Sequence, residues 1–412
     1  WFIEQLQGSQ QYYMPAEFTL KGHIDVPLLR AAIKHIVGRH EILRSQFITD
    51  PQGIPYVQVT DTFITPFQWL DASTFPVTQR QSQIKAALIQ HQAQPFDLSR
   101  DVLIRVLLVS DNEQHYLAFN MHHIVSDGAS MQIFAQELQT IYTQLLQGNV
   151  ELDSLPIQYA DYAAWQRNTL TAEYFTAAIN YWRTTLGDLE PLQSLPTDKV
   201  RSSVQKQSGL VYRQQLSRSL VEKIQQHAAS QSVTPFMWLL SSFMLFIGRI
   251  KQTEQVLIGT PTQGREHPQL NDLIGLFVNT LVMHAVLPDE LTFNAWLQQQ
   301  KERILQSFEY RNMPFDKLVE GLNCQRDLSH HPLVQIFFTL TVDEQPTFQL
   351  PGVEIAEARS EAREHHSAVK CDLELNAVID NQGLTVTWKF DEALYELATI
   401  THWADSFAVL LA

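Results

Sequence analysis

A strand pattern gives way to a helix pattern across a short polar segment in the first third of the chain. Side chains of residues 115–121 alternate between two faces, which predicts a β-strand. Ser126 or Asp127 fits the N-cap position of a following helix. Apolar residues then recur at helical spacing at Ile133, Phe134, Leu138, Ile141, Tyr142 and Leu145. We therefore expect a strand, a loop and a helix in direct succession.

Two adjacent histidines, His122 and His123, stand where this strand ends. Neighbouring side chains on a strand point to opposite faces, so one histidine is expected to face the protein interior and the other a cavity. An imidazole with an ordinary pKa near ~6.5 accepts a proton at neutral pH. Asp127 can anchor the loop by pairing with an arginine, and Gly128 permits a tight turn and close approach. Most single histidines are structural, but the strand-loop-helix context of this pair favours an active site.

The composition excludes several classes of protein. The chain has 412 residues, of which 45% are hydrophobic and 18% are charged, so we expect a globular protein of two or three lobes. A formal net charge of -15 argues against nucleic-acid binding, which needs a basic face. Cys324 and Cys371 lack metal-site spacing and are expected to be reduced, buried and cytoplasmic. No apolar run is long enough to predict a membrane span, and Trp1–Glu4 does not resemble a signal peptide.

The sequence around the histidine pair resembles a known signature. His122-His123-Ile-Val-Ser-Asp127-Gly128 resembles the active-site motif of condensation domains from non-ribosomal peptide synthetases, which belong to the chloramphenicol acetyltransferase-like superfamily. Other motifs of that family are matched in the same order at Trp1–Leu6, Arg39–Phe47, Leu155–Gln166, Ile274–Val282, Asn312–Val319 and Arg326–Phe338. The resemblance covers nearly the whole chain and is more specific than any one motif.

This resemblance implies an α/β fold with two lobes, each a mixed β-sheet with helices, arranged as a V around a central tunnel. Both halves of the sequence show mixed strand and helix patterns. We expect an N-terminal lobe at residues 1–170 that carries the histidine loop, a connecting helix and linker at 171–206, and a C-terminal lobe at 207–412 that closes the tunnel.

The implied reaction is amide formation between a donor aminoacyl or peptidyl thioester and an acceptor aminoacyl thioester. Both substrates are carried on the phosphopantetheine arms of carrier proteins, and the resemblance implies no bound cofactor and no metal. His123 is the expected catalytic histidine, acting as a general base or as a positioning group. The Gly128 N–H is the expected oxyanion donor. His122 is expected to pack inward, and Asp127 to anchor the loop.

Four further residues are assigned to structural positions beside the tunnel. Arg44 and Arg265 are both candidate partners of Asp127, and Arg265 is preferred because it would tie the second half of the chain to the loop. Asn279 lies in an apolar run where an unpaired buried amide would be costly, so it is expected to face a polar group. Ser130 follows the Asp-Gly turn. Without the resemblance, Arg39, His40 and Arg44 would be interpreted as a solvated helix end, and that interpretation is kept for Arg39.

The partners that the resemblance implies are an upstream and a downstream carrier protein and an adjacent adenylation domain. The motifs resemble most the clade that joins two L-residues, although Ala129 replaces a common tryptophan. Three alternatives are an epimerisation domain, a coenzyme A-dependent acyltransferase and an inactive module that recruits carrier proteins or tailoring enzymes. The Arg39–Phe47 motif argues against the first, the full motif series against the second, and the intact histidine pair against the third.

Overall fold

A computed structural model describes residues 12–187, 192–193, 195–205, 208–287, 290–324, 327–342, 349–360 and 367–412. The chain forms two compact units. Unit 1 contains the described parts of 1–168, 265–277 and 346–362, and unit 2 contains those of 169–264, 278–345 and 363–412. Residues 265–277 and 346–362 thus group with unit 1, although they lie within the predicted C-terminal lobe. The lobe boundaries expected from the sequence, at residues 170 and 206, therefore stay a prediction. The motif residues Trp1–Leu6 and Arg326 lie outside the described residues.

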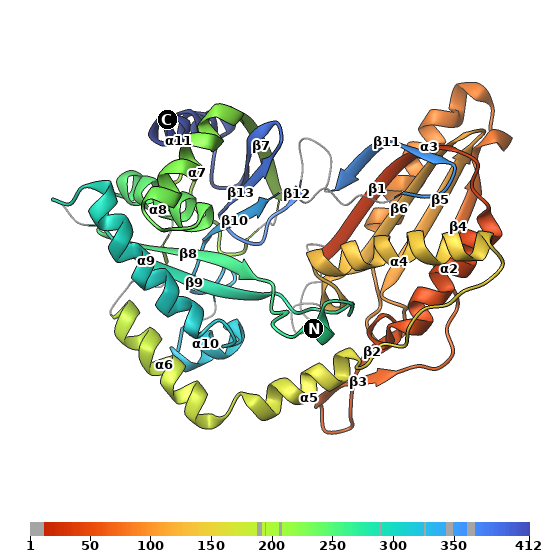
Figure 1. Ribbon diagram of the computed structural model, residues 1–412, viewed down its shortest axis with the longest axis horizontal. Coiled ribbons are helices and arrows are strands. Elements are labelled where there is room, and N and C mark those ends of the chain that lie inside the picture. The colour runs from red at the N-terminus through yellow and green to blue at the C-terminus, as the bar shows by residue number, and fades with distance from the viewer. Residues whose placement is uncertain are drawn as a thin grey trace. The chain divides into compact units, whose positions relative to one another are not determined.

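Unit 1 is built on a five-stranded sheet with the order β11-β1-β6-β5-β4 (Figure 1). Its strands are β1 (Tyr13–Gly22), β4 (Phe67–Asp71), β5 (Ile104–Asp111), β6 (Gln114–His122) and β11 (Val353–Ser360). Its helices are α2 (Val26–Arg39), α3 (Val77–Ala93), α4 (Gly128–Leu146) and α5 (Tyr159–Thr169). Neighbouring strands are antiparallel except β4 and β5, which run parallel.

The alternation of β6 separates two apolar clusters on the two faces of this sheet. Leu117, Phe119 and Met121 pack with α2 and α4, whereas Ala118 packs with α3. The predicted strand, loop and helix are confirmed by β6 and α4. This succession places the histidine pair at the end of a strand whose two faces are both covered.

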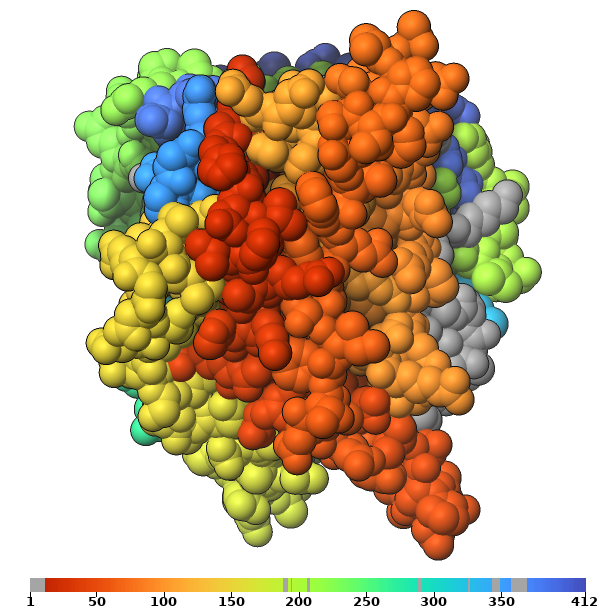
Figure 2. All heavy atoms as spheres, turned by 90° about the vertical axis from the view of Figure 1, so that its right-hand side faces the viewer, coloured from red at the N-terminus to blue at the C-terminus, as the bar shows by residue number. Residues whose placement is uncertain are grey.

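A small two-stranded sheet extends from unit 1. Its strands are β2 (Ser45–Thr49) and β3 (Pro55–Val59), which pair antiparallel. The residues of this hairpin project from the surface at the lower right of Figure 2, and most of β3 is exposed. The first strand of the hairpin contains the end of the motif Arg39–Phe47, and its Phe47 packs against the apolar core of unit 1.

Unit 2 contains a seven-stranded sheet with the order β12-β7-β14-β13-β10-β8-β9. Its strands are β7 (Ser208–Ser217), β8 (Gln255–Thr262), β9 (Asn279–Val286), β10 (Ile336–Val342), β12 (Ser367–Ala368), β13 (Leu373–Asp380) and β14 (Gly383–Asp391). Its helices are α6 (Ala172–Leu186), α7 (Arg218–Ser230), α8 (Pro235–Lys251), α9 (Phe293–Glu309), α10 (Phe315–Gly321) and α11 (Leu397–Leu411).

The helix α8 is the centre of the apolar core of unit 2. Thr234 caps its first turn, and most of its side chains are buried, as the nearly continuous apolar pattern predicts. The ring of Phe243 lies 6.0 Å from that of Trp388 on β14 and 5.7 Å from that of Phe407 on α11. No single helix among the described residues is long and apolar enough to cross a membrane. The helices α7 and α8 meet such a criterion only as a pair bent by 102°.

The segment predicted as a linker is bound to unit 2 through a buried ion pair. Arg201 Nη1 donates to Asp372 Oδ1 at 3.0 Å and to the Ser329 carbonyl at 3.1 Å. The Asp372 side chain is 1% exposed, and burial raises its pKa even though Arg201 opposes the shift. Asp198 also accepts a hydrogen bond from Glu396 N at 2.8 Å. The described residues 195–205 are therefore part of the folded unit and do not form a free tether.

We predict that Arg201→Ala destabilises the protein by about 3 kcal/mol, because it leaves the Asp372 carboxylate buried without its ion partner. The free energy of unfolding in urea measures this loss. A double variant, Arg201→Met with Asp372→Leu, should recover most of the stability because neither charge is then buried. Wild-type stability in Arg201→Ala would contradict the prediction.

Four histidines with little exposure to solvent share a depressed pKa. Burial is the main cause in His91, His122, His284 and His331, and it lowers the pKa of each from 6.5 to about 4. The unfolded chain therefore binds more protons than the folded chain between pH about 6.5 and about 4. The stability that these neutral rings contribute is present above that window and is lost as the pH falls through it.

We predict that the free energy of unfolding falls between pH 6.5 and pH 4, and that His91→Gln shows a fall smaller by roughly 1–3 kcal/mol. Glutamine keeps a polar side chain at this position but does not titrate. Urea unfolding at a series of pH values measures both slopes. Equal slopes for the two proteins would show that His91 does not contribute to acid unfolding.

Candidate active site

The first histidine of the pair, His122, is part of the protein interior. It is the last residue of β6 and is 3% exposed. Its Nδ1 accepts a hydrogen bond from Ile124 N at 3.0 Å, which caps the short 3₁₀ helix at His123–Val125. The rings of Tyr13 and Phe96 meet it edge to face at 5.6 and 6.0 Å. Since burial lowers its pKa to about 4, the ring is neutral at neutral pH.

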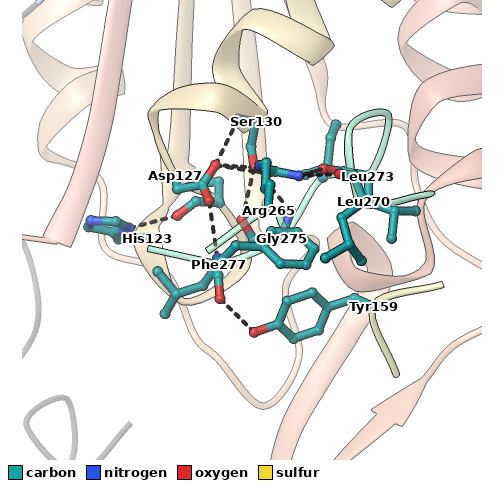
Figure 3. A network of polar contacts seen from close by, with 12 residues as sticks. His123, Asp127, Ser130, Tyr159, Arg265, Leu270, Leu273, Gly275 and Phe277 are labelled. Atoms are coloured by element: carbon teal, nitrogen blue, oxygen red, sulfur yellow. Dashed lines mark hydrogen bonds and ion pairs between the residues drawn. The ribbon is translucent and has the colours of Figure 1, made fainter. Parts of the chain in front are cut away.

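The second histidine, His123, is only partly buried, and the loop itself sets its ring orientation. His123 Nδ1 lies 2.6 Å from the carbonyl oxygen of Ser126. A carbonyl oxygen only accepts, so Nδ1 carries the hydrogen. In the neutral ring Nε2 is then the nitrogen with the lone pair, which is the atom that accepts a proton. Figure 3 shows His123 at one end of the polar network, apart from Arg265.

Asp127 is the centre of that network. It caps α4, and its side chain is nearly fully buried. Oδ1 accepts from Ser130 N at 2.8 Å, from Ser130 Oγ at 2.7 Å and from Arg265 Nη2 at 3.0 Å, while Oδ2 accepts from Phe277 N at 3.1 Å. Both oxygens are thus committed to holding the loop, and Asp127 is an anchor of the backbone.

Arg265 is the arginine that pairs with Asp127. Its Nη1 also donates to the carbonyls of Leu270 and Leu273 at 2.6 and 2.7 Å. Its guanidinium lies 4.1 Å from the centre of the Phe277 ring, a cation–π distance. The other candidate, Arg44, donates instead to the Thr60 carbonyl at 2.6 Å. Arg265 therefore joins Asp127 to the fold of residues 265–277.

Ser130 binds the same segment through its hydroxyl. Ser130 Oγ lies 2.9 Å from the Gly275 carbonyl and accepts from Gly275 N at 3.1 Å. A Cβ added at Gly275 would lie 2.2 Å from the ring of Tyr159, so only glycine fits there. The Tyr159 hydroxyl donates to the Leu276 carbonyl at 2.7 Å. Polar groups of α4 and α5 thus fix consecutive backbone groups of residues 275–277 (Figure 3).

The expectation that Arg39 belongs to a solvated helix end is wrong, and the next residue, His40, is buried. Arg39 Nε donates to Glu137 Oε1 at 2.8 Å, and Arg39 also donates to the Asp153 carbonyl. His40 is 1% exposed, and its Nε2 lies 2.9 Å from Glu137 Oε2. A carboxylate on α4 binds both side chains, and it lies almost a hundred residues further along the sequence.

Asn279 uses its whole amide to bind backbone within unit 2. Its Nδ2 donates to the carbonyls of Arg311 and Met313 at 2.9 and 2.7 Å, and its Oδ1 accepts from Phe315 N at 3.1 Å. The polar group that it was expected to face is therefore the peptide backbone that leads into α10. Asn279 lies on β9, and its amide fixes the backbone at the start of α10. These hydrogen bonds do not involve the Asp127 network.

The backbone at Gly128 is open to an approaching group. Gly128 is exposed, is the first residue of α4, and a Cβ added there would meet no atom within 4 Å. The free N–H groups at the start of a helix favour negative charge. The structure thus places an unobstructed helix N-terminus a few residues after the His123 ring. Within the described residues, no three His, Cys, Asp or Glu side chains form a group that could hold a metal ion.

Sequence reasoning missed His40, Glu137 and the specific tasks of Tyr159 and Phe277. Tyr159 lies in the motif Leu155–Gln166 and Phe277 in the motif Ile274–Val282, but the sequence of these motifs predicts only aromatic packing for the two rings. Their hydrogen bonds and ring contacts to the Asp127 network depend on segments that meet only in the fold. Their position inside a family motif is the one local signal that would have marked Tyr159 and Phe277 as candidate site residues.

Comparisons with known proteins identify the family of this chain. The family model described as "Condensation domain" matches residues 1–412. Tyrocidine synthase 3 from Brevibacillus parabrevis is 32% identical over 100% of this chain, which spans 6% of that relative. The teicoplanin X-domain in complex with OxyB has a TM-score of 0.87 at 22% identity, covering 98% of this chain and 89% of that one.

A condensation domain from the monacolin K polyketide synthase has a TM-score of 0.84 at 18% identity, covering 100% of this chain and 94% of that one. At these identities the solved structures show the fold alone. The curated relatives are much longer, and this chain spans between 5% and 16% of their lengths. The family match over the whole length confirms the resemblance and the mixed α/β fold, and the chain belongs to the condensation domain family.

Proposed function

We propose that this domain forms an amide bond between a donor aminoacyl or peptidyl thioester and an acceptor aminoacyl thioester. The observation that carries the proposal is the His123 ring, held by the Ser126 carbonyl with Nε2 as the basic nitrogen, on a loop anchored by Asp127. The similarity to multidomain peptide synthetases supports this reaction class. Both substrates arrive on phosphopantetheine arms of carrier proteins, and the domain supplies no cofactor of its own.

In the proposed reaction, the α-amine of the acceptor attacks the carbonyl carbon of the donor thioester. His123 Nε2 accepts a proton from the attacking nitrogen or holds that nitrogen in place by a hydrogen bond. The C–N bond forms, the C–S bond breaks, and the donor thiol leaves with a proton. The new amide stays on the acceptor carrier. A general base contributes about 10²–10⁴-fold and orientation contributes as much or more, so either role of His123 is sufficient.

Negative charge that develops on the thioester oxygen needs a donor. The Gly128 N–H at the start of α4 is the proposed donor, because the backbone there is exposed and unobstructed. Asp127 and Arg265 act only as positioning residues, since their polar atoms hold backbone and each other. Ser130 holds Gly275 in the same arrangement.

The proposed partners are an upstream donor carrier protein, a downstream acceptor carrier protein and a neighbouring adenylation domain. The multidomain nature of the relatives supports this class of partner. The motifs around His122 and Phe277 favour two L-configured substrates.

We predict that His123→Ala lowers the rate of dipeptidyl thioester formation by about 10²–10⁴-fold, because it removes the proposed base and positioning group. Donor and acceptor carriers loaded with aminoacyl-phosphopantetheine are mixed with the domain, and intact-protein mass spectrometry follows the acceptor. His402→Ala, which changes an exposed histidine on α11, is the matched control and should keep the wild-type rate.

No product from wild type, with measurable carrier binding, would contradict condensation and favour a recruitment module. Loss of the donor α-proton into deuterated water without dipeptide would indicate epimerisation. Product from free coenzyme A thioesters in place of the loaded carriers would indicate a free acyltransferase. Dipeptide at the wild-type rate from His123→Ala would remove His123 from the mechanism.

We predict that Arg265→Ala lowers kcat by about 10²-fold, because displacement of the Asp127 loop misplaces His123. Arg265→Lys should lose less, since it keeps the charge beside Asp127 but cannot bind both carbonyls of the 270–273 turn as the guanidinium does. Rates are compared at saturating loaded carriers, with circular dichroism as the folding control. A folded Arg265→Ala protein with the wild-type kcat would contradict the positioning role.

A further inference from the structure

His40 has both ring nitrogens engaged by groups that determine its tautomer. Its Nδ1 lies 3.4 Å from Ile274 N, and its Nε2 lies 2.9 Å from Glu137 Oε2. A backbone N–H only donates, so His40 Nδ1 accepts and carries no hydrogen. The ring proton is therefore on Nε2 and is donated to the Glu137 carboxylate. The side chain is buried, so these two bonds define its orientation.

Glu137 is itself held in place. Arg39 Nε donates to its other oxygen at 2.8 Å, and the side chain of Glu137 is 13% exposed. The backbone of Arg39 is fixed in turn, because its carbonyl accepts from Gln158 Nε2 at 3.1 Å. The Glu137 carboxylate thus accepts from the Arg39 guanidinium at one oxygen and from the His40 ring at the other. His40 is thus a fixed acceptor that faces the backbone of Ile274.

Ile274 directly precedes residues 275–277, whose backbone binds Ser130 and Asp127. Gly275 N donates to Ser130 Oγ, and Phe277 N donates to Asp127 Oδ2. Ile274 is 1% exposed, so its N–H has no access to water if His40 does not accept it. The His40 bond is therefore the first of consecutive contacts that fix this backbone against α4.

We propose that His40 is a positioning residue for His123, acting through the backbone of residues 274–277 on Asp127. This rests on the proposed function, because the loop that Asp127 anchors carries the catalytic histidine. The essential feature of His40 is the acceptor at Nδ1, and its bond to Glu137 serves to orient that acceptor. His40 touches neither His123 nor an approaching substrate in this role.

Two substitutions of His40 by an amide side chain test the hydrogen bonds of its two ring nitrogens one at a time. In His40→Asn the side-chain oxygen takes the place of Nδ1, so the bond from Ile274 N is kept and the bond to Glu137 is lost. In His40→Gln the side-chain nitrogen takes the place of Nε2, so the bond to Glu137 is kept and the acceptor for Ile274 is lost. His35→Asn and His35→Gln, on an exposed histidine of α2, are the matched controls.

We expect His40→Gln to lower kcat by about tenfold, with the KM for loaded carriers little changed, whereas His40→Asn keeps most of kcat. Hydrogen exchange of the peptide that contains residues 274–277 should speed up in His40→Gln and stay near wild type in His40→Asn. Urea unfolding of both variants is the third readout. A merely structural residue would change stability without this split between the two variants.

Equal losses of kcat in the two variants, in proportion to their loss of stability, would overturn the proposal. Wild-type kcat and exchange in a folded His40→Gln protein would overturn it as well. If the wild-type domain forms no dipeptide, the proposed function fails while hydrogen exchange still tests the His40 bond. If wild type is active and His123→Ala is not, an unaltered His40→Gln enzyme rejects only the role of His40.

Discussion

The buried carboxylate of Asp127 is the interaction on which the candidate site depends. A charge with so little access to water is stable only when it is paired and fully hydrogen-bonded. Asp127 meets that requirement with donors from Ser130, Arg265 and Phe277. Each donor comes from a segment whose backbone must lie in one place for the bond to form. The cost of leaving this charge unpaired is what makes the geometry of the histidine loop specific.

Residues 265–277 fold as part of unit 1, although the strands that precede and follow them, β8 and β9, belong to the sheet of unit 2. Side chains of unit 1 explain this. Tyr159 and Ser130 bind consecutive backbone groups, and Phe277 packs on the Arg265 guanidinium and against the Tyr159 ring. The segment has little regular secondary structure of its own, so polar side chains replace the hydrogen bonds that a strand partner would provide.

Local patterns predicted the parts of the fold that depend on local physics. Alternation identified β6, Asp127 was one of two candidate caps for α4, and the apolar run identified α8 as buried. The partner of Asp127 was narrowed to two arginines. Local sequence could not decide between them, because the choice depends on which distant segment reaches the loop. Arg265 meets Asp127 across 138 residues of sequence.

The contacts that the sequence did not identify have the same physical origin. Arg39 was expected at an exposed helix end, but the carboxylate of Glu137 on α4, which is distant in sequence, binds both Arg39 and His40. Asn279 was expected to face a polar group, and the group proved to be the backbone before α10. In both cases the sequence shows a polar group that needs a partner, while the identity of the partner is a property of the tertiary fold.

The two adjacent histidines show how one residue type takes two roles through its surroundings. Strand geometry turns His122 inward, where burial keeps it neutral and it caps the turn that follows. His123 begins that turn, and the Ser126 carbonyl three residues later selects its tautomer. The same short turn therefore buries one ring and directs the basic nitrogen of the other. Any group that shifts the turn changes the position of His123 without touching it, so the Asp127 network, and with it Arg265, has an indirect, positioning effect in the proposed reaction.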